Sequence, residues 1–264
     1  MKLNILIIGK NSFLGSNLSI FFKKRKIKFK KIDLIKFLKL KNSYLSKFNF
    51  IVNTAINGDY IQRRYNQKKD FDLLVCKKIK NIKTKLIIFS TGKIYGSGNN
   101  IKENSKKKPS GHYGKNKLIT ENKILKIREN VLILRLSNIV GKEKINNYRK
   151  ITNLFFDDIR KNLKKNTMII PRANYYKDFL LAEDFVKIVY MSMLINISGV
   201  FNLSSNQKIY IKDIAKRISE KTRATIIYSN EKTDSFTLNN NKLFNKLKMD
   251  KKLINLKKNM IRII

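Results

Sequence analysis

Short apolar runs alternate with amphipathic stretches along the first 141 residues. Residues 3–8 form an apolar run that ends at Gly9, a pattern that predicts a parallel strand buried on both faces. The same reasoning predicts further strands at 29–32, 50–54, 86–90 and 131–136, and helices at 14–24, 70–80 and 113–127. This β-α-β-α order predicts an α/β fold in which helices cover both faces of a doubly wound parallel sheet.

The pattern is looser after residue 141. Helices are predicted at 151–163, 184–194 and 211–221, and one strand at 199–203. Because no Pro- or Gly-rich linker interrupts the chain, we expect residues 142–264 to form a smaller C-terminal lobe packed against the first domain, with the strand near 199–203 returning to the main sheet. Three consecutive asparagines at 239–241 predict a surface loop.

The turn after the first predicted strand suits a dinucleotide. Gly9 lets the chain turn sharply, and Gly15 lets the following helix pack close to the sheet. The start of that helix, with Ser12, Phe13 and Leu14, offers free N–H groups and a positive dipole end to a pyrophosphate. Ser12 stands where a third glycine is expected, and its hydroxyl can bond a phosphate. The alternative interpretation is an ordinary strand-to-helix turn.

Two residues near this turn bear on which dinucleotide would bind. Asp33 ends the second predicted strand, where a carboxylate would bond the ribose hydroxyls of NAD. Lys10 favours the opposite choice, since a cation there suits the extra phosphate of NADP. We therefore expect residues 1–141 to form a Rossmann-type NAD(P)-binding domain, with NAD as the cofactor and NADP as the alternative.

A tyrosine and a lysine one helical turn apart form the candidate catalytic pair. Tyr113 and Lys117 are at positions i and i+4, so they share a helix face. An ammonium beside a phenol, together with the positive ring of an oxidised cofactor, would lower the pKa of the tyrosine and make it a general base or acid. Thr91, at the end of the fourth predicted strand, would hold the same substrate hydroxyl.

The Tyr-x-x-x-Lys pattern alone is weak in a chain so rich in lysine. Tyr65 with Lys69 and Tyr228 with Lys232 also match it. Only Tyr113 follows, at a suitable distance, a strand that ends in Ser-Thr. Position in the chain therefore selects Tyr113 as the candidate.

With these segments in order, the chain resembles the extended short-chain dehydrogenase/reductase family of nucleotide-sugar epimerases, dehydratases and reductases. Members show Gly-x-x-Gly-x-x-Gly at the first turn, then Ser-Ser/Thr-x-x-Val-Tyr-Gly and Tyr-x-x-x-Lys, matched here at 9–15, 90–96 and 113–117. The resemblance covers about residues 1–221. Further segments that match are those at 51–55, 135–141, 177–184 and 199–203.

The resemblance implies roles for particular residues. It makes Thr91, Tyr113 and Lys117 the catalytic set, with Thr91 also touching substrate, and makes Asn138 and Lys177 substrate contacts. It places the cofactor against the residues at its binding turn and catalytic helix, which are Gly9, Ser12, Phe13, Leu14, Gly15, Asp33, Ala55, Tyr113 and Lys117. Dehydratases of the family carry acidic residues after the threonine, whereas this chain has Gly92-Lys93, which disfavours that reaction. A homodimer is implied as well.

Composition disfavours several other kinds of protein, namely nucleic-acid-binding, membrane-bound and metal-binding ones. The net charge of +41 comes mostly from lysine spread along the whole chain, which AT-rich codon usage explains, so nucleic-acid binding is disfavoured. No run approaches the length of a membrane span, and no membrane partner is expected. One cysteine and one histidine make no disulfide and no ordinary metal site, which suits a cytoplasmic protein without a metal.

Three hypotheses remain open. The first is an NAD(P)-dependent enzyme acting on a nucleotide-linked sugar, slightly more of the epimerase type than an NADPH-dependent ketoreductase. The second is a non-catalytic dinucleotide-binding scaffold on the same fold. The third is a charge-driven nucleic-acid-binding module, whose binding would fall steeply with salt.

Overall fold

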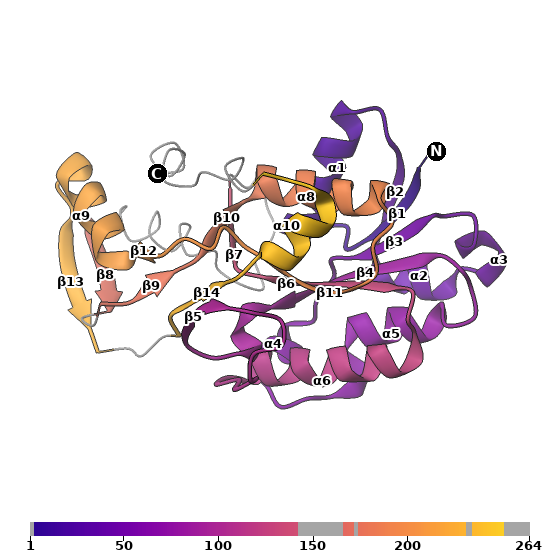
Figure 1. Ribbon diagram of the computed structural model, residues 1–264, viewed down its shortest axis with the longest axis horizontal. Helices are drawn as coiled ribbons and strands as arrows, with labels where there is room; N and C mark the ends of the chain where they lie inside the picture. The colour runs from indigo at the N-terminus through magenta and orange to yellow at the C-terminus, as the bar shows by residue number, and fades with distance from the viewer. Residues whose placement is uncertain (1–2, 142–165, 172–173, 231–233, 251–264) are drawn as a thin grey trace.

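The computed structural model describes residues 3–141, 166–171, 174–230 and 234–250. A parallel six-stranded sheet runs through its centre in the order β11-β6-β4-β3-β1-β2 (Figure 1). The strands are β1 (Asn4–Ile8), β2 (Lys28–Ile32), β3 (Phe50–Asn53), β4 (Lys85–Thr91), β6 (Val131–Leu136) and β11 (Gly199–Leu203). The strand order reverses between β1 and β3, so their carboxyl ends flank the point at which doubly wound sheets bind ligands.

Helices cover both faces of this sheet (Figure 1). One face carries α1 (Phe13–Lys24), α8 (Ala182–Leu194) and α10 (Asn241–Leu247). The opposite face carries α2 (Leu34–Lys39), α3 (Asn42–Leu45), α4 (Gly58–Gln62), α5 (Phe71–Lys78) and α6 (His112–Ile127). The predicted Rossmann-type doubly wound fold is therefore confirmed.

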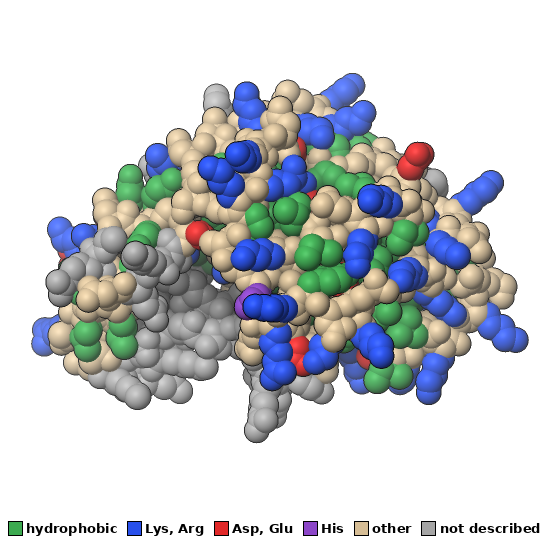
Figure 2. Space-filling model, turned by 90° about the horizontal axis from the view of Figure 1, so that it is seen from below, with side chains coloured by type: hydrophobic (Ala, Val, Ile, Leu, Met, Phe, Trp, Pro, Cys, Tyr) green, Lys and Arg blue, Asp and Glu red, His purple; other side chains and the backbone are tan. Residues whose placement is uncertain are grey.

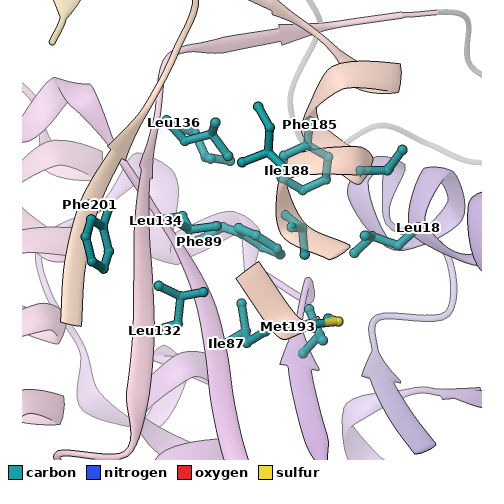
Figure 3. Close-up of a cluster of buried hydrophobic side chains, with 14 of the residues drawn as sticks. Leu18, Ile87, Phe89, Leu132, Leu134, Leu136, Phe185, Ile188, Met193 and Phe201 are labelled. Atoms are coloured by element: carbon teal, nitrogen blue, oxygen red, sulfur yellow. The ribbon is translucent and has the colours of Figure 1, made fainter. Parts of the chain in front are cut away.

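The central strands of the sheet are apolar on both faces because both faces are covered, whereas the edge strand β2 exposes lysines. Leu132 and Leu134 of β6 pack towards α8, whereas Val131 and Ile133 pack towards α5 and α6. Phe89 of β4 contacts Phe185 of α8 with ring centroids 5.1 Å apart, within the apolar cluster between the sheet and α8 (Figure 3). Alternate residues of one strand thus enter opposite cores, which explains why the strands are apolar runs rather than alternating patterns.

The remaining elements form a lobe at the side of the sheet (Figure 1). There β8 (Thr167–Pro171) pairs with β13 (Thr225–Ser229), and α9 (Ile211–Thr222) covers them with apolar side chains. Short pairs connect this lobe to the sheet domain. They are β5 (Gly98–Ile101) with β14 (Phe236–Leu238), β7 (Asn138–Val140) with β10 (Phe179–Leu181), and β9 (Tyr176–Lys177) with β12 (Ile209–Tyr210).

Most predicted elements lie within two residues of the observed bounds, and the strand expected near 199–203 lies beside β6 as β11. The helix predicted at 151–163 falls outside the described residues. The surface loop predicted at 239–241 is wrong, because Asn239 and Asn240 are buried and Asn241 begins α10. The Asn239 amide donates to Asn100 Oδ1, and the Asn240 amide donates to Ser204 O. These hydrogen bonds allow the two polar side chains to be buried.

Candidate active site

The glycine turn lies where β1 and β3 end side by side. Gly9 has a φ of +115°, and a Cβ placed on it would lie 2.5 Å from Thr54 Oγ1. A Cβ on Gly15 would lie 2.5 Å from Ser12 Oγ. Both positions therefore require glycine, because the turn is packed directly on the residue after β3.

Ser12 holds this turn together. It is the N-cap of α1, and its Oγ accepts the Gly15 N–H at 3.0 Å. Thr54 Oγ1 donates to Ile8 O at 2.7 Å, and Ser12 Oγ lies 2.5 Å from Thr54 Oγ1 and 3.1 Å from Gly9 O. The Ser12 hydroxyl is thus engaged inside the turn rather than presented to a phosphate. The backbone N–H groups of Phe13 and Leu14 lie in the first turn of α1, where no intrahelical acceptor exists.

Asp33 occupies the end of β2 on the same edge of the sheet. It caps α2, and Oδ1 accepts the Lys36 N–H at 2.8 Å. This hydrogen bond, with smaller contributions from the charges of Lys36 and Lys10, holds the pKa of the carboxyl below its usual value. Asp33 is therefore an ionised acceptor beside the glycine turn, and Lys10 lies close enough to act on it.

Tyr113 and Lys117 lie in the first two turns of α6, as the sequence predicts. The start of α6 packs on the turn η2 (Gly92–Ile94), since a Cβ on Gly114 would lie 2.6 Å from Lys93 O. Thr91 caps η2, and its Oγ1 accepts the Lys93 N–H at 3.3 Å. The structure thus brings the helix that carries the tyrosine and lysine against the turn that begins at the threonine.

Lys117 is buried among aromatic rings and one carboxylate. Its Nζ lies 6.0 Å from the ring centroid of Tyr113 and 5.7 Å from that of Tyr60. It donates to Asp72 Oδ2 at 2.6 Å. Burial is the largest single effect and acts to lower the pKa of Lys117, but the Asp72 carboxylate together with Tyr113 and Tyr60 outweighs it, and the pKa is raised. Lys117 is therefore a charged ammonium at neutral pH.

Without the cofactor ring that the sequence analysis also invokes, the pKa of the Tyr113 phenol is raised and not lowered. Burial raises its pKa, Lys117 opposes this, and Asp72 adds to the rise. Desolvation of a phenolate is the largest of these effects, so the pair by itself does not make Tyr113 a base. In the cofactor-free protein, Tyr113 is a proton donor.

Sequence reasoning missed Asp72, which follows the helix cap by two residues. Asp72 Oδ1 accepts from Asn53 Nδ2 at 2.6 Å, and Asn53 Oδ1 accepts the Ala55 N–H at 3.1 Å. Ala55 therefore lies where expected, after β3, but it is joined to Lys117 through two side chains. The available signal is an acidic residue beside the apolar run of this helix, in a chain with only 18 acids.

The two expected substrate contacts lie at the border with the lobe. Asn138 donates from its backbone N–H and from Nδ2 to Asp178 O, which ties β7 to the segment before β10. Lys177 Nζ donates to Asp234 O at 3.0 Å. Burial and the nearby charge of Lys93 lower the pKa of Lys177 to about 8. Lys177 of the lobe and Lys93 of η2 thus bring positive charge to one place beside Thr91.

Other kinds of site find little support in the described part of the chain. No cluster of three or more potential metal ligands occurs there. None of the helices described is both long enough and apolar enough to span a membrane. A cavity of about 560 Å³ lies at the amino-terminal edge of the sheet, near Phe50, Lys85 and Asn130, at the edge opposite the candidate site. Lysine and arginine side chains are spread over the face in Figure 2, with apolar and neutral side chains between them.

Comparisons with known proteins identify the family and the fold. The model of the family described as "RmlD substrate binding domain" matches residues 1–238. No curated protein sequence matches the chain significantly.

Solved structures with the same fold include several nucleotide-sugar enzymes. TunA, described as an NAD-dependent NDP-hexosamine 5,6-dehydratase of tunicamycin biosynthesis, is 17% identical with a TM-score of 0.78, over 94% of this chain and 92% of its own. MoeE5 in complex with UDP-glucuronic acid and NAD is 16% identical with a TM-score of 0.75, over 93% of each chain. A dTDP-4-dehydrorhamnose reductase from Clostridium acetobutylicum is 16% identical with a TM-score of 0.73, over 94% of each chain.

Proposed function

The chain belongs to the RmlD substrate binding domain family, and on that premise we propose that it is an NAD-dependent oxidoreductase or isomerase acting on a nucleotide-linked sugar. The observation that carries the proposal is the placement of Tyr113 and Lys117. Their helix packs against the turn that begins at Thr91, and the Lys117 ammonium lies 6.0 Å from the Tyr113 ring. A proton donor beside a fixed cation at the carboxyl edge of the sheet suits proton transfer to or from a sugar oxygen.

The glycine turn fits a dinucleotide. Gly9 packs on Thr54 with no room for a side chain, which leaves backbone and the first turn of α1 to face a pyrophosphate. The ionised Asp33 at the end of β2 suits the ribose hydroxyls of NAD, and MoeE5 has this fold and holds NAD. Lys10 beside Asp33 keeps NADP as the alternative cofactor.

The bound nicotinamide would supply the acceptor or donor of hydride. The chain supplies the remaining groups: Tyr113 would exchange a proton with the sugar hydroxyl, Thr91 would bond the same oxygen, and Lys117 would hold the cofactor ribose and support the phenolate. Lys177 and Asn138 are proposed substrate contacts. The positive charge of Lys177 and Lys93 suits the diphosphate of a nucleotide sugar.

Among the reactions of such enzymes we slightly favour an epimerase, which regenerates its cofactor within each turnover. An NADPH-dependent ketoreductase is the alternative, and the dTDP-4-dehydrorhamnose reductase with this fold is an example of a reductase. Gly92-Lys93 after Thr91 provides no acid for water elimination, so a dehydratase is disfavoured. A non-catalytic dinucleotide-binding scaffold would bind the cofactor without turnover.

Two measurements test this proposal. Calorimetric titration with NADH and NADPH, on protein freed of endogenous cofactor, should give saturable binding of at least one, and preference for NADPH would favour the reductase. A panel of UDP- and dTDP-linked sugars, incubated with the preferred cofactor and followed by NMR, should then give one converted sugar. Binding of neither cofactor at millimolar concentration would contradict the proposal.

Tyr113→Phe separates the enzyme from the scaffold. Loss of a general acid or base costs about 10²- to 10⁴-fold in turnover, while cofactor binding should persist. Tyr228→Phe is the matched control, because Tyr228 also belongs to a Tyr-x-x-x-Lys sequence but lies exposed on β13. Unchanged turnover in Tyr113→Phe would remove Tyr113 from the mechanism.

A further inference from the structure

A buried negative charge touches the candidate catalytic lysine. Asp72 Oδ2 and Lys117 Nζ are 2.6 Å apart, and each side chain is 6% exposed. The roles proposed above for Tyr113, Lys117 and Thr91 do not require this carboxylate. In a chain with 59 basic and 18 acidic residues, its position calls for an explanation.

Asp72 is fixed from a second side. Asn53, at the end of β3 and 2% exposed, donates from Nδ2 to Asp72 Oδ1 at 2.6 Å and accepts the Ala55 N–H through Oδ1. One carboxylate oxygen therefore faces β3, while the other faces Lys117. Because both oxygens have partners, Asp72 is held beside Lys117 and beside the segment after β3.

Few other charges face this pair from the surrounding elements. Asp70 is engaged by the Leu73 N–H, the Tyr65 hydroxyl and Thr120 Oγ1. Glu121, further along α6, is paired with Arg135 of β6. On the elements packed against α6, the charged or titratable groups are Asp59 and Tyr60 of α4, Asp72, Cys76, Lys77 and Lys78 of α5 with Asp70 at its cap, Lys93 of η2, and Lys85 at the far end of β4.

From this geometry we propose that Asp72 is the counter-ion of Lys117 and that it biases the site towards the oxidised cofactor. The inference rests on the proposed function, since it concerns the nicotinamide that Tyr113 and Lys117 would serve. Asp72 is a positioning and charge-setting residue and is not itself in the proton transfer. Asp72 also raises the pKa of Tyr113, because its negative charge opposes the positive charge of Lys117.

The bias arises from one charge on the nicotinamide ring. NAD⁺ and NADH share the same pyrophosphate and riboses, but the oxidised nicotinamide ring carries one more positive charge. With Asp72 in place, the charges of Lys117 and Asp72 nearly cancel at the ring. Without it, burial lowers the pKa of Lys117, so the comparison is made at a pH low enough to keep the lysine protonated. The ammonium then acts unopposed in a poorly solvated site, and the cationic ring is disfavoured by about tenfold relative to the neutral one. An enzyme that starts each turnover from bound NAD⁺ would benefit from this bias.

The test compares dissociation constants in wild type and Asp72→Asn. Asparagine has the same shape and can still accept from Lys117, but its amide nitrogen then faces the Asn53 amide nitrogen. Loss of that hydrogen bond affects both cofactors alike, so the readout is the ratio of the two affinities and not either affinity alone. Calorimetric titrations with NAD⁺ and NADH should show the ratio Kd(NAD⁺)/Kd(NADH) rising by about tenfold in Asp72→Asn. A merely structural role would weaken both cofactors alike and leave the ratio unchanged, which would overturn the proposal.

Two further comparisons keep the result unambiguous. Asp59→Asn removes the same charge from a partly exposed side chain and should leave the ratio at the wild-type value. If Asp72→Asn does not fold, Lys117→Met is compared with the Asp72→Asn/Lys117→Met double variant, in which neither charge is left buried alone. The double variant should have the higher ratio, and equal ratios would contradict the proposal. Wild-type protein that binds neither cofactor would instead overturn the proposed function itself.

Discussion

In the six-stranded sheet, the central strands β1, β3, β4 and β6, of four to seven residues each, bury apolar side chains on both faces, whereas the lobe pairs strands of two to five residues from distant parts of the chain. The sheet is stabilised mainly by continuous apolar contact between layers. The junction with the lobe instead depends on buried polar side chains that bond backbone groups of several segments.

Asp178 shows how the junction is held. It is 0% exposed and accepts from the backbone N–H groups of Ser205, Asn206 and Leu238 and from the Ser205 hydroxyl. One carboxylate therefore joins the start of β10 to the loop after β11 and to β14. An apolar residue there would leave these donors without an acceptor, so specificity at this junction comes from hydrogen bonds.

The largest expected effect sharpens this comparison, because the sheet domain also contains a buried polar contact. Glu121 of α6 and Arg135 of β6 form a buried ion pair at 2.7 Å. Glu121→Ala would leave the Arg135 guanidinium buried without its carboxylate and should lower the free energy of unfolding by about 3–5 kcal/mol, measured in urea. Glu129→Ala, which removes an exposed acid just beyond α6, should change it little. Similar values for both variants would contradict a structural role for the pair.

The second effect is a pH dependence that arises in the junction. Burial raises the pKa of Asp178 to about 6, although its hydrogen bonds oppose the rise. An acid with a raised pKa in the folded state contributes stability that is present below pH 4 and lost as the pH rises towards 6. For a shift of about two units the loss is about 3 kcal/mol.

This contribution is isolated by subtraction. The free energy of unfolding should be measured from pH 4 to pH 7 in wild type and in Asp178→Asn, which has no carboxyl to titrate. The wild-type value minus the variant value should fall over this range. A difference that stays constant or rises would show that Asp178 does not titrate with a raised pKa.

The third effect comes from the asparagines that sequence analysis placed in a surface loop. Asn240 Nδ2 donates to Ser204 O at 2.9 Å in the interior. Asn240→Ala would leave that carbonyl without its donor and should cost about 1–3 kcal/mol in unfolding free energy. Asn241→Ala is the matched control, because Asn241 is exposed at the start of α10. Equal effects from the two variants would restore the surface-loop interpretation.

These cases show why the sheet could be predicted and the junction could not. A strand buried on both faces appears in sequence as an apolar run, and the distance of Tyr113 and Lys117 from such a strand distinguishes them from the other Tyr-x-x-x-Lys pairs. Strands of two or three residues, such as β9 and β12, have no detectable period, and their partners lie far away in sequence. Buried polar partners such as Asp72 and Asp178 are recognised only by what surrounds them, because their residue type is ordinarily found at the surface.

The smallest expected effect concerns the glycine turn, where Ser12 replaces a glycine of the family pattern. Its hydroxyl caps α1 and contacts Thr54, so Ser12→Ala should lower the free energy of unfolding by about 1 kcal/mol. Ser12→Gly should cost only a few tenths of a kcal/mol, since glycine is tolerated at an N-cap. Because the hydroxyl is engaged inside the turn, both variants should bind NADH nearly as tightly as wild type by calorimetry. A large loss of affinity in both variants would show that the hydroxyl turns outwards to the phosphate when the cofactor binds.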